Sequence, residues 1–259
     1  MYDKLKVFEK ELQYIENPKI RDFTAKVISN IPEYFFGTAA SSTGKYHPKY
    51  ALGRGGLVRH TKAAVEIAME LLRLEQNTLV FSLDEKDCII SALICHDGWK
   101  HGDTYSQYTV AEHPVVAADH VLELADKGEK KFAKLISDNI RSHMGEWNTD
   151  YKSKTEIMPK PSTPSEKFVH ECDYLASRKS LTFEFEKYYD PDKFDTIDNP
   201  ELKNKINDLI ELCKSKISSG VDREEIYKQI SLKTGGNKNP NSIKSISTVS
   251  DLMDIIQNM

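Results

Sequence analysis

Apolar residues recur along most of this chain at the spacing of an α-helix. Leu5, Phe8, Leu12 and Ile15 follow one another at steps of three or four residues, which predicts a helix with one apolar face. A second helix is expected over about 18–31, because an Asn-Pro pair suited to a helix start precedes its apolar series. Similar patterns predict helices at about 57–75, 83–97, 114–126, 129–143 and 164–180.

The starts of two expected helices carry a capping signal. Ser82 with Glu85, and Thr163 with Glu166, each match the capping box, in which the two side chains satisfy free backbone donors of the first turn. Residues 144–163 form a long polar connection between helices. Connections of that length in a compact domain often act as lids or binding loops, so this one is a candidate for such a role.

The remaining patterns suggest the fold class and the domain organisation. Strand-like alternation is confined to a short candidate at residues 182–186, so the fold is predicted to be all-α. The character of the chain changes near residue 190, after which three helices are expected, at about 201–218, 222–232 and 248–258. We therefore predict a helical bundle over residues 1–190 and a small C-terminal helical appendage over residues 191–259.

Composition narrows the class of protein. The 259 residues are 39% hydrophobic and 29% charged, with a net charge of −4, so no basic face for long nucleic acid is expected. No apolar run approaches the length of a membrane span. The four cysteines have no paired spacing and are predicted to be buried thiols in a reducing compartment, which indicates a cytoplasmic protein.

Histidines and aspartates on the apolar sides or at the ends of the expected helices are the main chemical feature. These are the ligand types of divalent metals such as Zn, Fe, Mn or Ni, and there are six: His60, His96, Asp97, His113, His143 and Asp173. A buried carboxylate needs a compensating partner, and a metal is one candidate. A single histidine on an apolar face is more often a hydrogen-bonded core residue. The six together make one shared metal site an equal alternative to separate core roles, and periodicity by itself leaves both open.

The segments around these residues resemble the HD-domain metal-dependent phosphohydrolase superfamily, which is named after the His-Asp doublet. The order and approximate spacing match over residues 50–180, about half of the chain. The matching segments are residues 55–61 (GGLVRHT), 92–100 (ALICHDGWK), 112–114 (EHP), 140–145 (IRSHMG) and 170–178 (HECDYLASR).

The resemblance implies an HD-domain helical bundle and assigns the ligands. One metal would be held by the first histidine, the doublet and the last aspartate, which are His60, His96, Asp97 and Asp173. Relatives with two further histidines bind a second metal, which would fall to His113 and His143 with Asp97 bridging. Whether one or two ions are bound, and which of Mn, Fe, Ni, Co, Mg or Zn, stays open.

The activity implied by the resemblance is that of a phosphomonoesterase or phosphodiesterase. A metal-activated water would cleave a phosphate ester of a nucleotide or short oligonucleotide, with Asp97 and Lys100 as catalytic residues and Lys100 reaching the phosphate. Further candidates for binding the phosphate are Arg59, Lys62, Arg141 and Arg178. Aromatic residues that could stack on a base are Trp99, Tyr105, Tyr108 and Trp147.

Three alternatives stay open at this point. Segments 140–145 and 170–178 are similar to the branch that contains 3′–5′ exoribonucleases, so a phosphodiesterase of that type is one. A non-catalytic nucleotide-binding HD module that signals through the C-terminal helices is another, although retention of all six ligands argues against it. The third is a di-iron oxygenase, because one oxygenase family shares this ligand arrangement. An oligomer is compatible with the sequence, which predicts no role for residues 190–259.

Overall fold

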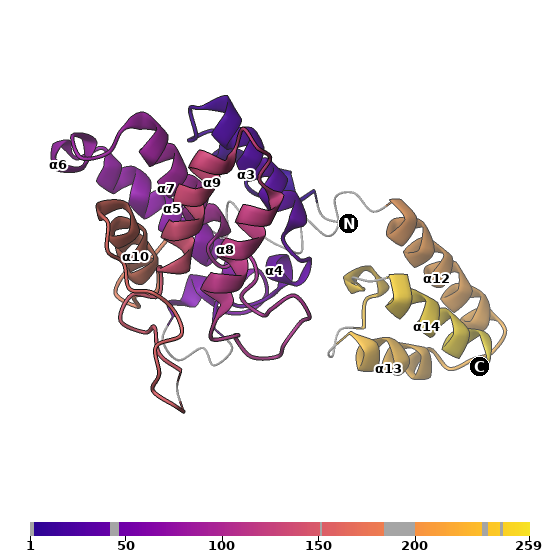
Figure 1. Cartoon of the computed structure of the whole chain (residues 1–259). Coiled ribbons are helices and arrows are strands. Elements are labelled where there is room, and N and C mark those ends of the chain that lie inside the picture. The colour runs from indigo at the N-terminus through magenta and orange to yellow at the C-terminus, as the bar shows by residue number, and fades with distance from the viewer. Residues whose placement is uncertain (1–2, 42–46, 151, 184–199, 235–237, 244–245) are drawn as a thin grey trace. The chain divides into compact units, whose positions relative to one another are not determined.

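The computed structural model describes residues 3–41, 47–150, 152–183, 200–234, 238–243 and 246–259 (Figure 1). Its internal contacts divide the chain into two compact units, an N-terminal unit within Asp3–Pro191 and a C-terminal unit within Asp192–Met259. The described residues form helices and turns with no strand, and one isolated β-bridge joins Thr149 to Glu156. The prediction of an all-α fold is confirmed.

The N-terminal unit begins with two short helices in place of the expected first helix. α1 (Lys4–Val7) and α2 (Glu9–Leu12) are separated at Phe8, which leaves the helical conformation with φ −109° and ψ 18°. Phe8 is fully buried against Phe35 and Phe36, at ring distances of 6.1 and 6.4 Å. The prediction of one continuous helix was therefore wrong at this residue, where tertiary packing of the aromatic ring accompanies the break.

The next helices follow the sequence pattern more closely. α3 (Pro18–Asn30) starts as predicted, with the side chain of Asn17 accepting a hydrogen bond from the backbone N–H of Lys19. It is followed by α4 (Tyr34–Gly37) and by the short 3-10 helix η1 (Lys49–Ala51). α5 (Gly56–Leu72) begins at the glycine pair, where a Cβ on Gly56 would lie 2.3 Å from the backbone oxygen of Ala51.

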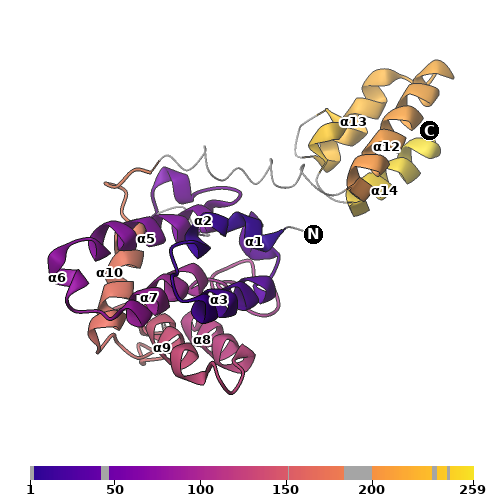
Figure 2. The ribbon, with the colours of Figure 1, turned by 90° about the horizontal axis from the view of Figure 1, so that it is seen from above.

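The central helix of the N-terminal unit is α7 (Leu83–Cys95), which follows the short α6 (Glu75–Thr78). Every residue from Asp87 to Cys95 is buried, because α7 packs against α3, α5, α9 (Lys130–Arg141) and α10 (Pro164–Ala176). α8 (His113–Leu124) lies beside α9, as Figure 2 shows. The residues that directly follow the end of α7, His96 and Asp97, are therefore buried inside the bundle.

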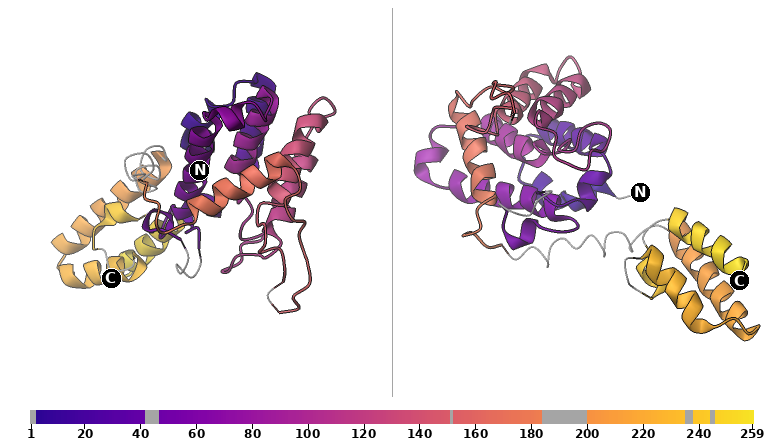
Figure 3. Two further views of the ribbon diagram at one scale, coloured as in Figure 1. Left: turned by 90° about the vertical axis from the view of Figure 1, so that its left-hand side faces the viewer. Right: turned by 90° about the horizontal axis from the view of Figure 1, so that it is seen from below.

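Both predicted capping boxes are present. The Ser82 hydroxyl accepts from the backbone N–H of Glu85, whose carboxylate accepts from the backbone N–H of Ser82. Thr163 and Glu166 are paired in the same way at the start of α10. The described parts of the connection, 144–150 and 152–163, extend beyond the ends of α9 and α10 (Figure 3).

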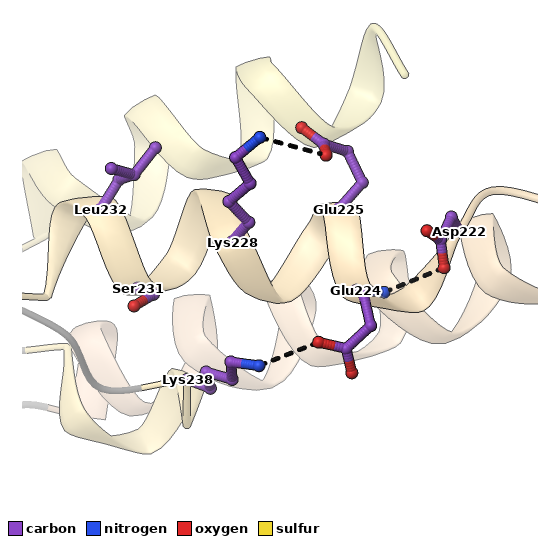
Figure 4. Close-up of a pocket in the computed structure, with 7 residues that line it drawn as sticks. All are labelled: Asp222, Glu224, Glu225, Lys228, Ser231, Leu232 and Lys238. Carbon is purple, nitrogen blue, oxygen red and sulfur yellow. Dashed lines mark hydrogen bonds and ion pairs between the residues drawn. The ribbon is translucent and has the colours of Figure 1, made fainter.

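The C-terminal unit has a core of its own. Its helices are α12 (Pro200–Ser218), α13 (Arg223–Lys233) and α14 (Ile246–Gln257), with the 3-10 helix η3 (Pro240–Ser242) between the last two. Fully buried side chains on these helices form the core: Leu209, Ile226, Ile230, Val249, Leu252 and Ile256. Two exposed ion pairs lie on α13: Lys228 pairs with Glu225, and Glu224 pairs with Lys238 from the segment after the helix (Figure 4).

Three further expectations concern local features. All four cysteines are buried and unpaired, as predicted. No helix in the described part of the chain combines the length and the apolar character needed to cross a membrane. The strand candidate at 182–186 lies mostly outside the described residues, and its first two residues, Thr182 and Phe183, are not in a strand.

Candidate metal centre and adjoining cavity

Five helices bring the predicted ligands to one place in the N-terminal unit. Two ligands lie within helices, in the second turn of α5 and the last turn of α10, and the others stand at the start of α8 or directly after the ends of α7 and α9. The six residues that meet there are His60, His96, Asp97, His113, His143 and Asp173. All are at most 1% exposed except Asp173, whose side chain is 17% exposed.

The Asp97 carboxylate lies between two pairs of histidines. Its Oδ2 is 3.4 Å from Nε2 of His96 and 3.8 Å from Nε2 of His60. Its Oδ1 is 3.0 Å from Nε2 of His113 and 3.8 Å from Nε2 of His143. Each pair of histidines forms with Asp97 a group whose ligand atoms all lie within 4.8 Å of one another. Asp97 is common to both groups.

Asp173 lies nearest to the first pair, and it also forms with His96 and His143 a group whose ligand atoms lie within 4.8 Å of one another. Its Oδ1 accepts a hydrogen bond from Nε2 of His60 at 2.8 Å and lies 3.5 Å from Nε2 of His96. The first side therefore has four candidate ligands, His60, His96, Asp97 and Asp173. The second side has three, His113, His143 and the shared Asp97.

Backbone carbonyls determine which nitrogen of three histidines faces the centre. Nδ1 of His96, His113 and His143 lies 2.7, 2.8 and 2.7 Å from the carbonyl oxygen three residues earlier. With that hydrogen on Nδ1, each neutral ring presents the lone pair of Nε2 to the centre, as metal-ligating histidines do. Nε2 of His96 and His113 and Oδ1 of Asp97 are buried without a hydrogen bond. These buried acceptors fit a divalent metal ion.

The electrostatics of the centre also favour a cation. Burial opposes the charge on Asp97, but Lys100 and His96 outweigh it and hold the pKa of Asp97 well below its usual range. The pKa of Asp173 is likewise lowered, against burial, by the hydrogen bond from His60 and by the neighbouring His96 ring. Burial lowers the pKa of His96, but the Asp97 and Asp173 carboxylates outweigh burial and raise it to about 10. Binding of a metal ion beside these carboxylates would displace the proton from Nε2 and leave the neutral ring, with its lone pair, as the ligand.

For His143 of the second pair, burial outweighs the carboxylates. Burial, together with the charge on His96, lowers the pKa of His143 to about 3, so the ring is neutral at ordinary pH. A neutral imidazole is the form that ligates a metal.

A cavity of about 540 Å³ adjoins these residues. On the side of the metal ligands its wall contains His113, His143 and Asp173. Lys100 also lines it, with Nζ 2.5 Å from Oδ2 of Asp97. The rest of the described wall includes His47, Met144, Trp147, His170, Tyr174 and Arg178, together with Ala40, Ser41, Thr109 and Ser177. The volume lies in the range of small-molecule sites.

Three of the predicted substrate-binding residues, Lys100, Trp147 and Arg178, are in this wall. Arg59 and Arg141 are not among the described residues that line it. Arg59 donates hydrogen bonds to the backbone oxygens of the loop before α5, at 2.5 Å for Tyr50 and 2.9 Å for Leu52. Arg141 forms a surface ion pair with Asp119. Successive helical residues point about 100° apart, so adjacency to His60 does not place Arg59 at the site. The structure does not support the predicted roles of Arg59 and Arg141.

The other charged and aromatic candidates also lie outside the described wall. Lys62 forms a buried ion pair with Glu11 at 2.6 Å. Trp99 is 3% exposed and stacks on His120 at a ring distance of 4.4 Å. Tyr105 and Tyr108 are exposed elsewhere on the surface. Of the four aromatic candidates, Trp147 alone is in the described cavity wall.

The sequence interpretation missed two histidines of the cavity wall. His47 is a ring neighbour of His60 at 5.2 Å, and mainly burial lowers its pKa to about 3. No periodic signal marks it, because it lies in an irregular loop. His170 could have been found, because it precedes Asp173 by three residues and so shares its helix face. Its Nδ1 donates to the carbonyl oxygen of His143 at 2.7 Å.

Gly145 is required beside His170. Its φ is +59°, and a Cβ at this position would lie 2.2 to 2.7 Å from three atoms of the His170 ring. The loop that follows His143 can therefore approach α10 only with glycine at this residue.

Comparisons with protein-family models, with curated proteins and with solved structures found no match for this chain.

Proposed function

We propose that the N-terminal unit is a metal-dependent phosphohydrolase that cleaves a phosphate ester of a nucleotide or short oligonucleotide. The observation that carries this proposal is the Asp97 carboxylate, whose two oxygens face separate pairs of histidine Nε2 atoms beside a cavity lined by Lys100. Two groups that share a carboxylate suit a centre of two metal ions, a common arrangement in phosphatases and nucleases.

Asp97 and Lys100 have distinct roles in this proposal. A divalent metal bound there would supply a water of lowered pKa and polarise a phosphoryl oxygen. Asp97 orients both halves of the centre, because each of its oxygens serves one histidine pair. Lys100 lies between Asp97 and the cavity, so its ammonium group can bind a phosphoryl oxygen and stabilise negative charge that develops during cleavage.

The test combines metal content with phosphate release. Purified full-length protein is analysed for bound metals, and then incubated with nucleotides, cyclic dinucleotides and short RNA in the presence of Mn²⁺, Co²⁺, Ni²⁺ or Mg²⁺. Asp97→Asn should remove both bound metal and activity, whereas Asp119→Asn, at a surface aspartate paired with Arg141, should change neither. Metal-free protein whose activity survives Asp97→Asn would overturn the proposal.

The same assay separates the alternative activities. An exoribonuclease would shorten RNA stepwise from its 3′ end, whereas a phosphomonoesterase would release inorganic phosphate. Oxygen consumption without phosphate release would indicate the oxygenase. Nucleotide binding without any turnover under all four metals would indicate the non-catalytic module.

A further inference from the structure

Two exposed aromatic residues and an arginine stand together in the cavity wall. Trp147 comes from the loop after α9, and Tyr174 and Arg178 come from α10 and the segment just after it. The rings of Trp147 and Tyr174 are nearly parallel, 10° apart, with centroids separated by 5.7 Å. Cζ of Arg178 lies 4.1 Å from the centre of the Tyr174 ring. Three planar groups therefore lie side by side in one part of the wall.

The rings of Trp147 and Tyr174 are both open to solvent. Trp147 is 49% exposed and Tyr174 is 36% exposed, although both could bury much apolar area. Rings that line a pocket while still open to solvent offer a surface on which another planar group can stack. The cavity itself provides the space for such a group.

The charges of the same cavity indicate a second property of its ligand. Lys100 and Arg178 line the wall and are cationic, and both side-chain types bind phosphate. Arg178 already donates to the hydroxyl of Ser177 at 2.6 Å, which orients its guanidinium group. A ligand that suits the wall has a flat aromatic part and an anionic part, as a nucleotide does.

The wall has no amide side chain to select adenine. Among the described residues it contains no Asn or Gln, the side chains that pair bidentately with adenine. Its hydroxyl side chains, Ser41, Thr109 and Ser177, can each pair with a donor or an acceptor and so do not by themselves select one base. Stacking by itself tolerates all bases, because every base has a π-face.

We propose that Trp147, Tyr174 and Arg178 form a base-tolerant stacking site for a nucleotide whose phosphate lies toward Lys100 and the metal ligands. This inference rests on the proposed function for the direction of the phosphate, but binding of the base can be measured without turnover. The nucleotide is either free or the terminal unit of a short oligonucleotide, since both present one base and a phosphate.

The first measurement is tryptophan fluorescence of the full-length protein. The chain has two tryptophans, of which Trp99 is buried, so quenching by a ligand in the cavity reports Trp147. AMP, GMP, CMP and UMP should each quench it, with dissociation constants within about tenfold of one another because stacking dominates. Ribose 5-phosphate, which has the phosphate but no base, should leave the fluorescence unchanged. A short oligonucleotide in a parallel titration distinguishes the terminal unit from the free nucleotide.

The second measurement is calorimetric titration of variants. Trp147→Leu should weaken AMP binding by about 5- to 150-fold, the range expected for loss of one base–aromatic stack. Its binding of ribose 5-phosphate should stay the same. The matched control is Tyr108→Leu, at a tyrosine that is 64% exposed and outside the described cavity wall, and it should bind AMP as the wild type does.

The outcomes separate this inference from the proposed function. Equal binding of AMP and ribose 5-phosphate, or AMP binding unaffected by Trp147→Leu, overturns the stacking site even if metal-dependent phosphate release is observed. A strong preference for one base overturns its base tolerance. Absence of metal and of phosphate release, with AMP binding that depends on Trp147, overturns the proposed function and leaves the stacking site standing.

Discussion

Gly145 gives a prediction whose magnitude can be worked from the structure. In Gly145→Ala the residue must keep a φ of +59°, which costs about 1–2 kcal/mol for a residue with a Cβ. The new methyl group would also meet the His170 ring at 2.2 to 2.7 Å. Moving that ring would break its hydrogen bond to the carbonyl of His143, worth about 0.5–1.5 kcal/mol. We expect the free energy of unfolding to fall by about 2–3 kcal/mol.

Two other glycines separate these contributions. Gly53 has a φ of +66° with nothing within 4 Å of a Cβ, so Gly53→Ala should show the conformational cost alone. Gly128 has neither a positive φ nor a close neighbour, so Gly128→Ala should be neutral or slightly stabilising. The three variants therefore form a matched series, in which the same glycine-to-alanine substitution is made at sites that differ in φ and in neighbouring atoms.

The assay follows unfolding by tryptophan fluorescence. Both tryptophans lie in the N-terminal unit, so their signal reports this unit separately from the C-terminal helices. The melting temperature of Gly145→Ala should fall by about 4–12 °C. If Gly145→Ala melted together with Gly128→Ala, the assigned backbone conformation and ring contact would both be refuted. If it matched Gly53→Ala, the contact with His170 would be relieved without cost.

Three further predictions concern the supporting structure and can be checked by urea unfolding. Lys62→Met leaves the buried Glu11 without its partner and should destabilise the unit by about 3–5 kcal/mol, whereas the double variant with Glu11→Leu should recover most of that loss. Arg59→Ala should lower the free energy of unfolding by at least about 1.5–3 kcal/mol, because charged hydrogen bonds to backbone oxygens are lost. Arg141→Ala removes only a surface ion pair and should lower it by less than about 1 kcal/mol. Equal losses for the two variants would contradict these assignments. Ser82→Ala removes the cap of α7 and should cost about 1 kcal/mol, and an unchanged midpoint would show that the capping box is not a source of stability.

Some features of the fold could be predicted because they depend on residues close together in the sequence. The cap at Asn17 and the box at Ser82 depend on contacts within one turn, so their patterns predicted the observed bonds. The break in the helix at Phe8 could not be predicted in this way, because it accompanies packing against Phe35 and Phe36 from a later segment.

For the candidate site, the sequence by itself determined which residue types are available and which helix ends or faces carry them, because helical periodicity is local. The tertiary structure alone decided that the two oxygens of Asp97 face different histidine pairs. It also decided that Arg178 lines the cavity while Arg59 holds the loop before α5. These outcomes depend on side-chain directions across helices far apart in the chain, which no local pattern encodes.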